Sequence, residues 1–276
     1  MSAGTLYVVA TPLGNLGDLS ERAKQVLRDV AVVAAEDTRR TRTILTHVDA
    51  RPRVLSFHAH SPTTRLETLV RALVAGDNVA LLTDAGTPTI SDPGVVLVRR
   101  ARSAGATVVA VPGPSAVVAA LSVSGLSADR YTFLGFPPRK GQARKRILEY
   151  VATSPWTTVV FESAGRLVRL LEDLASTCGG GRDAVVAREL TKLHEELKIG
   201  TLSDLAVYYE ENPPRGEVTL LVAGRPPEAA AQDEDAIRER ARALLDEGLS
   251  RRDVAGRLAA EFAVPRREAY RMVTRL

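Results

Sequence analysis

Short apolar runs that alternate with helical patterns constrain the fold of this chain more than any other feature of its sequence. Residues 6–10, Leu-Tyr-Val-Val-Ala, form a continuously apolar run, as expected for a strand that is covered on both faces. Apolar residues at helical spacing follow from Leu19 to Val30, and further strand patterns occur at residues 79–82 and 107–111. This strand–helix series predicts an α/β fold with a largely parallel sheet.

Two changes in composition indicate domain boundaries. The prolines and glycine of Val-Pro-Gly-Pro-Ser, residues 111–115, end a strand abruptly, and the strand–helix alternation then starts again. Near residue 226 the composition turns to Pro, Ala and acidic residues, which is typical of a linker. We therefore expect an N-terminal α/β domain at 1–111, a second α/β domain at 112–225, a linker at 226–234 and a helical domain at 235–276.

The C-terminal segment has the pattern of three helices, at residues 235–247, 250–261 and 265–275. Ser250 and Asp253 have the spacing of a capping box, at the start of the second helix. The pattern fits a helix-turn-helix unit, and it fits equally well a plain helical cap on the main body. The sequence leaves both interpretations open.

Composition excludes several classes of protein. The chain of 276 residues has 45% hydrophobic residues and a single cysteine, Cys178, so an internal disulfide is impossible. It shows no signal-peptide pattern, and its apolar runs are shorter than the ~18 residues of a membrane span. We expect a cytoplasmic protein without a membrane segment. Its charge is uneven, because residues 139–146 hold five basic residues and no acid. Such a cluster suits phosphate backbones, but it also suits a solvated face.

Three loops follow predicted strands: TPLGNLGD at 11–18, TDAGTPTISDPG at 83–94 and VPGPSA at 111–116. In open α/β sheets, ligands bind beyond the carboxyl ends of the strands, where such loops gather. The first loop lacks the G-x-G-x-x-G pattern of a dinucleotide site, so NAD binding is poorly supported. Their glycines nevertheless allow a ligand to approach the backbone closely.

Several blocks, in this order and spacing, carry a resemblance to a known family: ATPLGNLGDLS, AAEDTRRT, LLTDAGTPTISDPG, VPGPSAVVAAL, FLGFPPRK, FESAGRL and ARELTKLHEELKIGTL. The sequence resembles the tetrapyrrole-methylase superfamily, and more closely its branch of small-subunit rRNA (cytidine-2′-O)-methyltransferases. The likeness covers about residues 5–225, and the helical tail is similar to the small C-terminal domain of that branch.

The resemblance implies two α/β domains with S-adenosylmethionine in the cleft between them, usually in a homodimer. The substrate that it implies is the assembled small ribosomal subunit, with a decoding-site cytidine of 16S rRNA as the target. The positions that would line the cofactor are Asp84, Ala85, Gly86, Thr87, Ile90, Ser115 and Ala116. Asp92 and Pro93 line the cofactor in one interpretation and merely shape the loop in the other.

Methyl transfer to a 2′-hydroxyl is helped by a positioned base that removes the hydroxyl proton. Glu36 and Asp37 follow a predicted strand, although pairing with the neighbouring arginines is an alternative role for both. His58 is a further candidate, because histidine as a residue type can exchange a proton near neutral pH, but it also suits a structural role or an RNA contact. Lys192, with Glu195, resembles the lysine–acid pairs of unrelated 2′-O-methyltransferases. The sequence does not choose among these candidates, and no metal site is expected.

Basic residues beside these motifs are natural phosphate contacts, which position RNA without reading its sequence. The candidates are Arg39, Arg40, Arg42, Arg139, Lys140, Arg144, Lys145 and Arg146. Only 4% of the residues are aromatic, so extensive base stacking is not expected and recognition would rely on RNA shape and 2′-hydroxyls.

Two other functions remain open from the sequence. A corrin or porphyrin methylase would use the same cofactor loops on a small anionic macrocycle. A transcription regulator would use the helical tail to bind DNA and the main body to bind an effector.

Overall fold

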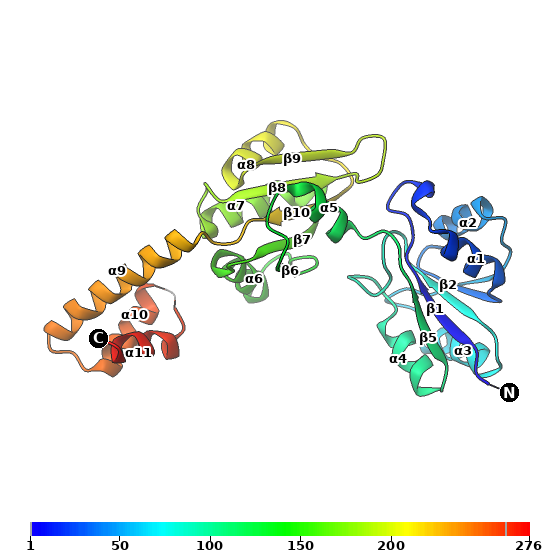
Figure 1. The fold of residues 1–276 in the computed structure, drawn as a ribbon, viewed down its shortest axis with the longest axis horizontal. Coiled ribbons are helices and arrows are strands. Elements are labelled where there is room, and N and C mark those ends of the chain that lie inside the picture. Colours follow the sequence, from blue (N-terminus) through cyan, green and yellow to red (C-terminus); the bar gives the residue numbers. More distant parts are fainter. Residues whose placement is uncertain (1, 263) are drawn as a thin grey trace. The chain divides into compact units, whose positions relative to one another are not determined.

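The computed structural model describes residues 2–262 and 264–276, and residues 227–233 by their backbone only. The chain divides into two compact units. The first comprises Met1–Ala152 with Trp156–Ala223, and the second comprises Thr153–Pro155 with Gly224–Leu276. The first unit contains two five-stranded sheets, and the second is helical (Figure 1).

The first sheet is wholly parallel, with the order β3-β2-β4-β1-β5, which confirms the prediction from the alternating pattern. Its elements are β1 (Thr5–Val9), α1 (Glu21–Asp29), β2 (Val32–Ala35), α2 (Thr38–His47), β3 (Arg53–Ser56), α3 (Thr63–Val74), β4 (Val79–Leu82), α4 (Val95–Ser103) and β5 (Thr107–Val111). A short 3₁₀ helix, η1 (Leu16–Asp18), precedes α1.

Both faces of this sheet are buried, which explains the continuously apolar strands. Along β4, Ala80 and Leu82 pack into one core cluster, with Leu27 of α1 and Ile44 of α2. The alternate β4 residues pack into a second cluster with α3 and α4. Successive strand residues point to opposite faces, so every residue of β4 is buried.

The second sheet is mixed, with the order β6-β7-β10-β8-β9. Strand β10 runs antiparallel to β7 and to β8, and β8 and β9 form an antiparallel pair. Its elements are α5 (Ala116–Ser124), β6 (Tyr131–Phe133), α6 (Gln142–Thr153), β7 (Thr157–Ser163), η2 (Ala164–Arg166), α7 (Leu167–Cys178), β8 (Asp183–Arg188), β9 (Glu196–Thr201), α8 (Leu202–Glu211) and β10 (Glu217–Val222).

The helical unit contains α9 (Pro227–Asp246), α10 (Arg251–Glu261) and α11 (Arg266–Thr274). The segment predicted as a linker, 226–234, is helical from Pro227 onward, where α9 begins. The physical reason is that proline suits the first position of a helix and that the following Glu-Ala-Ala-Ala-Gln favours the helical conformation. Ser250 caps α10 as predicted, since its side chain accepts a hydrogen bond from the Asp253 amide.

A small apolar core holds the three helices together, and it includes Leu244, Val254, Leu258 and Val273, none of which is measurably exposed. At the surface, the Arg240 guanidinium donates to the Glu261 carboxylate at 2.9 and 3.2 Å, which ties α9 to α10. Among the described residues, no helix is long and apolar enough to cross a bilayer.

Candidate functional site

A cavity of the first unit collects the three loops that the sequence singled out. It is lined by all seven predicted cofactor positions, together with Glu36, Arg40 and Lys192. The remaining lining residues are Leu13, Ser91, Asp92, Val117, Phe136, Phe161, Ala187, Glu189, Leu190, Glu217, Val218 and Thr219. The cavity therefore combines the carboxyl ends of the parallel strands with residues of β7, β8 and β10.

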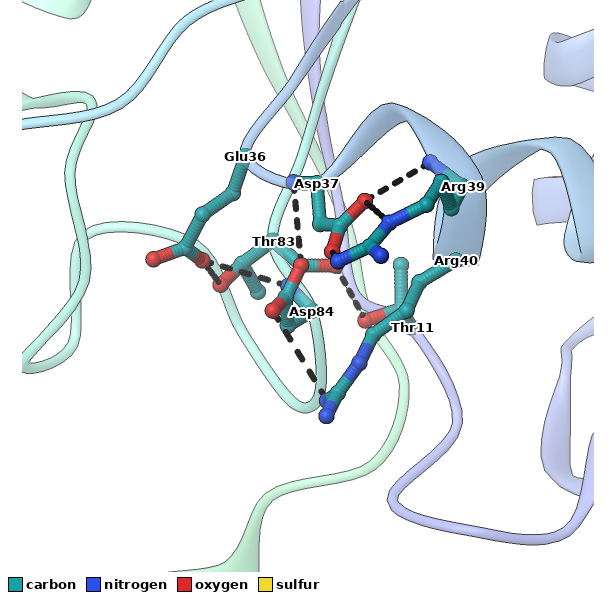
Figure 2. A network of polar contacts seen from close by, with 7 residues as sticks. All are labelled: Thr11, Glu36, Asp37, Arg39, Arg40, Thr83 and Asp84. Atoms are coloured by element: carbon teal, nitrogen blue, oxygen red, sulfur yellow. Dashed lines mark hydrogen bonds and ion pairs between the residues drawn. The ribbon is translucent and has the colours of Figure 1, made fainter.

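A polar network links the ends of the neighbouring strands β2 and β4 (Figure 2). The Glu36 carboxylate accepts hydrogen bonds from the Thr83 hydroxyl at 2.6 Å and from the Asp84 amide at 3.2 Å. The Asp84 carboxylate in turn accepts from the Asp37 amide at 3.0 Å, and Arg40 lies 3.7 Å from its second oxygen. This network fixes Glu36 and Asp84 at the edge of the cavity.

Backbone contacts hold the three loops against one another. Thr11 and Gly86 exchange amide-to-carbonyl hydrogen bonds of 2.8 and 3.0 Å, and the Thr11 hydroxyl donates to the Thr83 carbonyl at 3.1 Å. The Thr87 hydroxyl donates to the Pro114 carbonyl at 3.2 Å. Gly86 has a φ of +79°, a conformation that glycine adopts without steric cost. The loops thus form one cross-linked wall.

Backbone strain is concentrated in two segments beside this cavity. Thr89 and Ser91 have φ values of 75° and 63°, and Glu189 and Thr191 have values of 50° and 65°. Residues other than glycine seldom adopt positive φ, least of all the β-branched threonine. Strain of this kind persists only where the surrounding structure enforces it, and it is typical of binding and catalytic sites.

Several carboxylates line the cavity, and the pKa values of two of them, Asp92 and Asp84, are raised. Burial, together with the charges of Glu36, Asp84 and Glu217, raises the pKa of Asp92 to about 6, against a side-chain hydrogen bond with Thr83 that lowers it. Burial, then the charge of Glu36, also raises the pKa of Asp84. An excess of negative charge in a partly desolvated cavity suits a ligand that carries positive charge.

The four candidate bases do not all reach the cavity. Glu36 and Lys192 line it, whereas Asp37 and His58 do not. Asp37 caps α2, and hydrogen bonds from the side chain and backbone of Arg39 lower its pKa to about 2. His58 lies in a turn, where its Nδ1 accepts from the His60 amide at 3.2 Å. The structure therefore leaves Asp37 and His58 with local structural contacts.

The segment between β8 and β9 carries Lys192, whose ammonium lies 2.9 Å from the Glu189 carboxylate. The predicted partner Glu195 does not line the cavity and instead accepts from the Thr191 amide. Sequence reasoning named Asp92 as a residue of the loop and not as a group with a raised pKa, and it gave no signal for Glu217 and Thr219 of β10. The raised pKa of Asp92 cannot be inferred from the loop motif alone, because it depends on the burial of the side chain.

Of the predicted phosphate contacts, Arg144 is the one whose side chain is buried in the fold. Its side chain is only 8% exposed, and its guanidinium donates to the Asp173 carboxylate at 2.6 and 2.9 Å. A further bond of 3.2 Å reaches the Pro138 carbonyl. The other candidates have exposed side chains: Arg39, Arg40, Arg42, Arg139, Lys140, Lys145 and Arg146. Arg144 therefore supports the fold beneath them, because a desolvated guanidinium needs a carboxylate partner.

Gly94, which ends the cavity loop, has no room for a side chain. Its φ is +134°, and a β-carbon there would lie 2.6 Å from Leu81 Cδ2 and 3.2 Å from Thr89 Cγ2. We expect the Gly94→Ala substitution to lower the free energy of unfolding by roughly 1–3 kcal/mol, the cost of overpacking a core. Urea unfolding of the Gly94→Ala variant and the wild type measures this difference in the free energy of unfolding. Gly165→Ala, where a β-carbon meets nothing within 4 Å, is the control, and equal stability of both variants would contradict the prediction.

Within the described residues, no group of three or more His, Cys, Asp or Glu side chains is arranged to hold a metal ion.

Comparisons with known proteins agree with this geometry. The family described as Tetrapyrrole (Corrin/Porphyrin) Methylases matches residues 5–206. A relative from Xylella fastidiosa strain Temecula1, named ribosomal RNA small subunit methyltransferase I, is 48% identical over 97% of this chain and 98% of its own length. A relative of the same name from Escherichia coli O157:H7 is 42% identical over 95% of this chain and 91% of its own.

Solved structures show the same fold at lower identity. A cobalt precorrin-4 methyltransferase matches with a TM-score of 0.62 and 18% identity, over 79% of this chain and 94% of that one. A uroporphyrin-III C-methyl transferase from Thermus thermophilus, complexed with S-adenyl homocysteine, matches with a TM-score of 0.58 and 20% identity, over 80% of this chain and 97% of that one.

Proposed function

This chain belongs to the tetrapyrrole (corrin/porphyrin) methylase family, and from that premise we propose that it methylates the 16S rRNA of the small ribosomal subunit. The methyl donor is S-adenosylmethionine, and the acceptor is the 2′-hydroxyl of a decoding-site cytidine. The observation that carries the proposal is near-full-length similarity to relatives named ribosomal RNA small subunit methyltransferase I. The same membership is the ground for proposing a cytoplasmic homodimer.

The cavity suits the proposed cofactor in two respects, the small size of several lining side chains and the negative charge of others. Ala85, Gly86 and Ala116 are small residues that admit a folded ligand to the backbone. Asp84 and its neighbouring carboxylates complement a cation, and S-adenosylmethionine carries a sulfonium and an ammonium group. When bound, it supplies an activated methyl group. The chain's task is to hold the acceptor hydroxyl in line with that group and to take its proton.

We assign the removal of the hydroxyl proton to Asp92. Asp92 lines the cavity, and a pKa of about 6 lies close to the operating pH, where a general base works best. Glu36 is the second candidate in the same cavity. One of its carboxylate oxygens already accepts from Thr83 and Asp84, so Glu36 is better suited to holding the loop and keeping the Asp92 pKa high.

The carboxylates of the cavity also influence which methyl acceptor can bind there. Asp84, Asp92 and Glu217 face a shared cavity, and their charge would repel a small anionic macrocycle, which makes a tetrapyrrole acceptor the weaker alternative. An RNA phosphate backbone has a different place to bind, since Arg139, Lys140 and Arg146 form an exposed basic surface.

The proposed function is tested by methyl transfer from labelled S-adenosylmethionine. Small subunits from a strain that lacks the activity are the substrate, with protein-free rRNA and a tetrapyrrole precursor as parallel substrates. We expect label in the rRNA of the subunit, at a 2′-O-methylcytidine. Label in the macrocycle and none in RNA would contradict the proposal. Specific binding to duplex DNA that is lost on deletion of residues 235–276 would instead favour a transcription regulator.

A further inference from the structure

A second pocket lies in the part of the chain that forms the mixed sheet, and four arginines dominate it. It is lined by Arg139, Arg144, Ser163, Gly165, Arg166 and Arg169, and we call it the arginine pocket. Arg139 precedes α6 and Arg144 lies in its first turn, whereas Arg166 ends η2 and Arg169 lies in the first turn of α7. Two helix starts thus bring their basic residues together.

Two of these arginines are fixed by the fold. Arg144 is buried and pairs with Asp173. The Arg166 guanidinium donates to the Pro137 carbonyl at 2.8 Å and lies 2.9 Å from Glu162, whose carboxylate is fully buried. Their positions are therefore set before any ligand arrives, and a preorganised guanidinium loses little freedom on binding.

The other two arginines carry the uncompensated charge. The side chains of Arg139 and Arg169 are exposed, and in the described part of the chain neither makes an ion pair with an acidic side chain. Because Asp173 and Glu162 balance only Arg144 and Arg166, the pocket keeps two positive charges. Guanidinium forks match the oxygens of a phosphate group.

We propose that the arginine pocket binds a phosphodiester group of the RNA substrate, outside the cavity where the methyl group is transferred. The proposal rests on the proposed function, which makes RNA the substrate. None of the lining residues is aromatic, so the pocket offers no aromatic ring for base stacking. The pocket therefore positions the backbone and reads no sequence. An acidic protein segment is the competing ligand.

The test changes the two exposed arginines, because Arg144 and Arg166 support the fold. In methyl transfer to isolated small subunits, we expect the Arg139→Gln/Arg169→Gln variant to raise KM about 10-fold or more and to leave kcat and S-adenosylmethionine binding unchanged. The slope of log KM against log salt should fall by roughly 0.7–0.9 for each phosphate that the variant no longer neutralises. Arg99→Gln/Arg100→Gln, on exposed positions of α4, removes the same charge elsewhere and is the control.

Gly165 provides a second test that leaves every arginine in place. A β-carbon at Gly165 would meet nothing within 4 Å, so a longer side chain is tolerated there. We expect Gly165→Glu to raise KM by about the same factor as the double variant, since its carboxylate competes with the phosphate. Gly165→Gln has the same size without the charge and should raise KM far less.

The outcomes separate this proposal from the function on which it rests. If the arginine variant and its control have the same KM and the same slope of log KM against log salt, the proposal that the arginine pocket binds RNA phosphate is overturned. If the wild-type protein methylates no RNA, the pocket is tested by the binding of a fluorescein-labelled RNA hairpin. Weaker binding by the arginine variant than by its control supports the proposal, and equal binding overturns it. Displacement of the hairpin by polyglutamate as readily as by polyuridylate would overturn the phosphodiester assignment.

Discussion

We expect the Asp92→Asn substitution to lower kcat for methyl transfer by roughly 10²–10⁴-fold, the usual contribution of a general base. The amide keeps the size of the side chain but cannot take the hydroxyl proton. In the wild-type protein, kcat should rise with pH as the Asp92 carboxyl ionises, with an apparent pKa of about 6. Single-turnover rates between pH 5 and 8, a range set about that pKa, measure both effects. Glu36→Gln is the comparison, and a larger loss there than in Asp92→Asn would move the base to Glu36.

Stability gives an independent check on the same side chain. The pKa of Asp92 is about 6 in the folded chain, above the ordinary value of 3.8, so the folded state binds the proton more tightly than the unfolded state. The stability that this contributes is present below pH 4 and is lost as the pH rises toward 6. Asparagine resembles the neutral carboxyl. Asp92→Asn should therefore be more stable than wild type at pH 7.5, by about 1 kcal/mol after allowance for solvent screening, and equally stable at pH 4.

The Arg166→Gln substitution should lower the free energy of unfolding by about 3–5 kcal/mol, the usual cost of leaving a buried charge without its partner. The Glu162 side chain is 0% exposed, and its Oε2 lies 2.9 Å from Arg166. Its other oxygen accepts from the Ser163 amide at 2.8 Å, a bond that cannot neutralise the charge. Without Arg166, the carboxylate must be protonated or the segment must open.

Urea unfolding of the whole chain measures this effect, and the matched control is the Glu162→Gln/Arg166→Gln double variant. The double variant removes both charges, so it should recover a large part of the lost stability. A cost below about 1 kcal/mol for Arg166→Gln alone, which is typical of an exposed ion pair, would show that Glu162 is not buried as a charge.

The sequence predicted the elements whose signal is local. β1 and β4 are short apolar runs and were recognisable as strands covered on both faces, since both faces of the first sheet are packed. β9 was missed because none of its residues is fully buried, so its apolar pattern is weak. α2 was not recognised either, because its start at Thr38 depends on the cap that Asp37 provides.

In the candidate site, too, the features with a local sequence signal were predictable, and those that depend on distant residues were not. The glycine-rich loops were recognisable because close backbone packing demands such residues, as at Gly86. The burial of Arg144 was not predictable, because its partner Asp173 is 29 residues away and on another helix. The same holds for Asp92, whose pKa is raised first by burial and then by the charges of Glu36, Asp84 and Glu217, because both the burial and these neighbours exist only in the folded chain.

The positive φ values at Thr89, Ser91, Glu189 and Thr191 also limit how this protein can be adapted to heat. Glycine at each position would relieve roughly 1–2 kcal/mol of backbone strain, although its freer unfolded chain returns part of that gain. The same exchange would free the two segments that shape the cavity. At these four positions we therefore expect a gain in thermal stability to lower the turnover rate, and a gain in turnover rate to lower thermal stability.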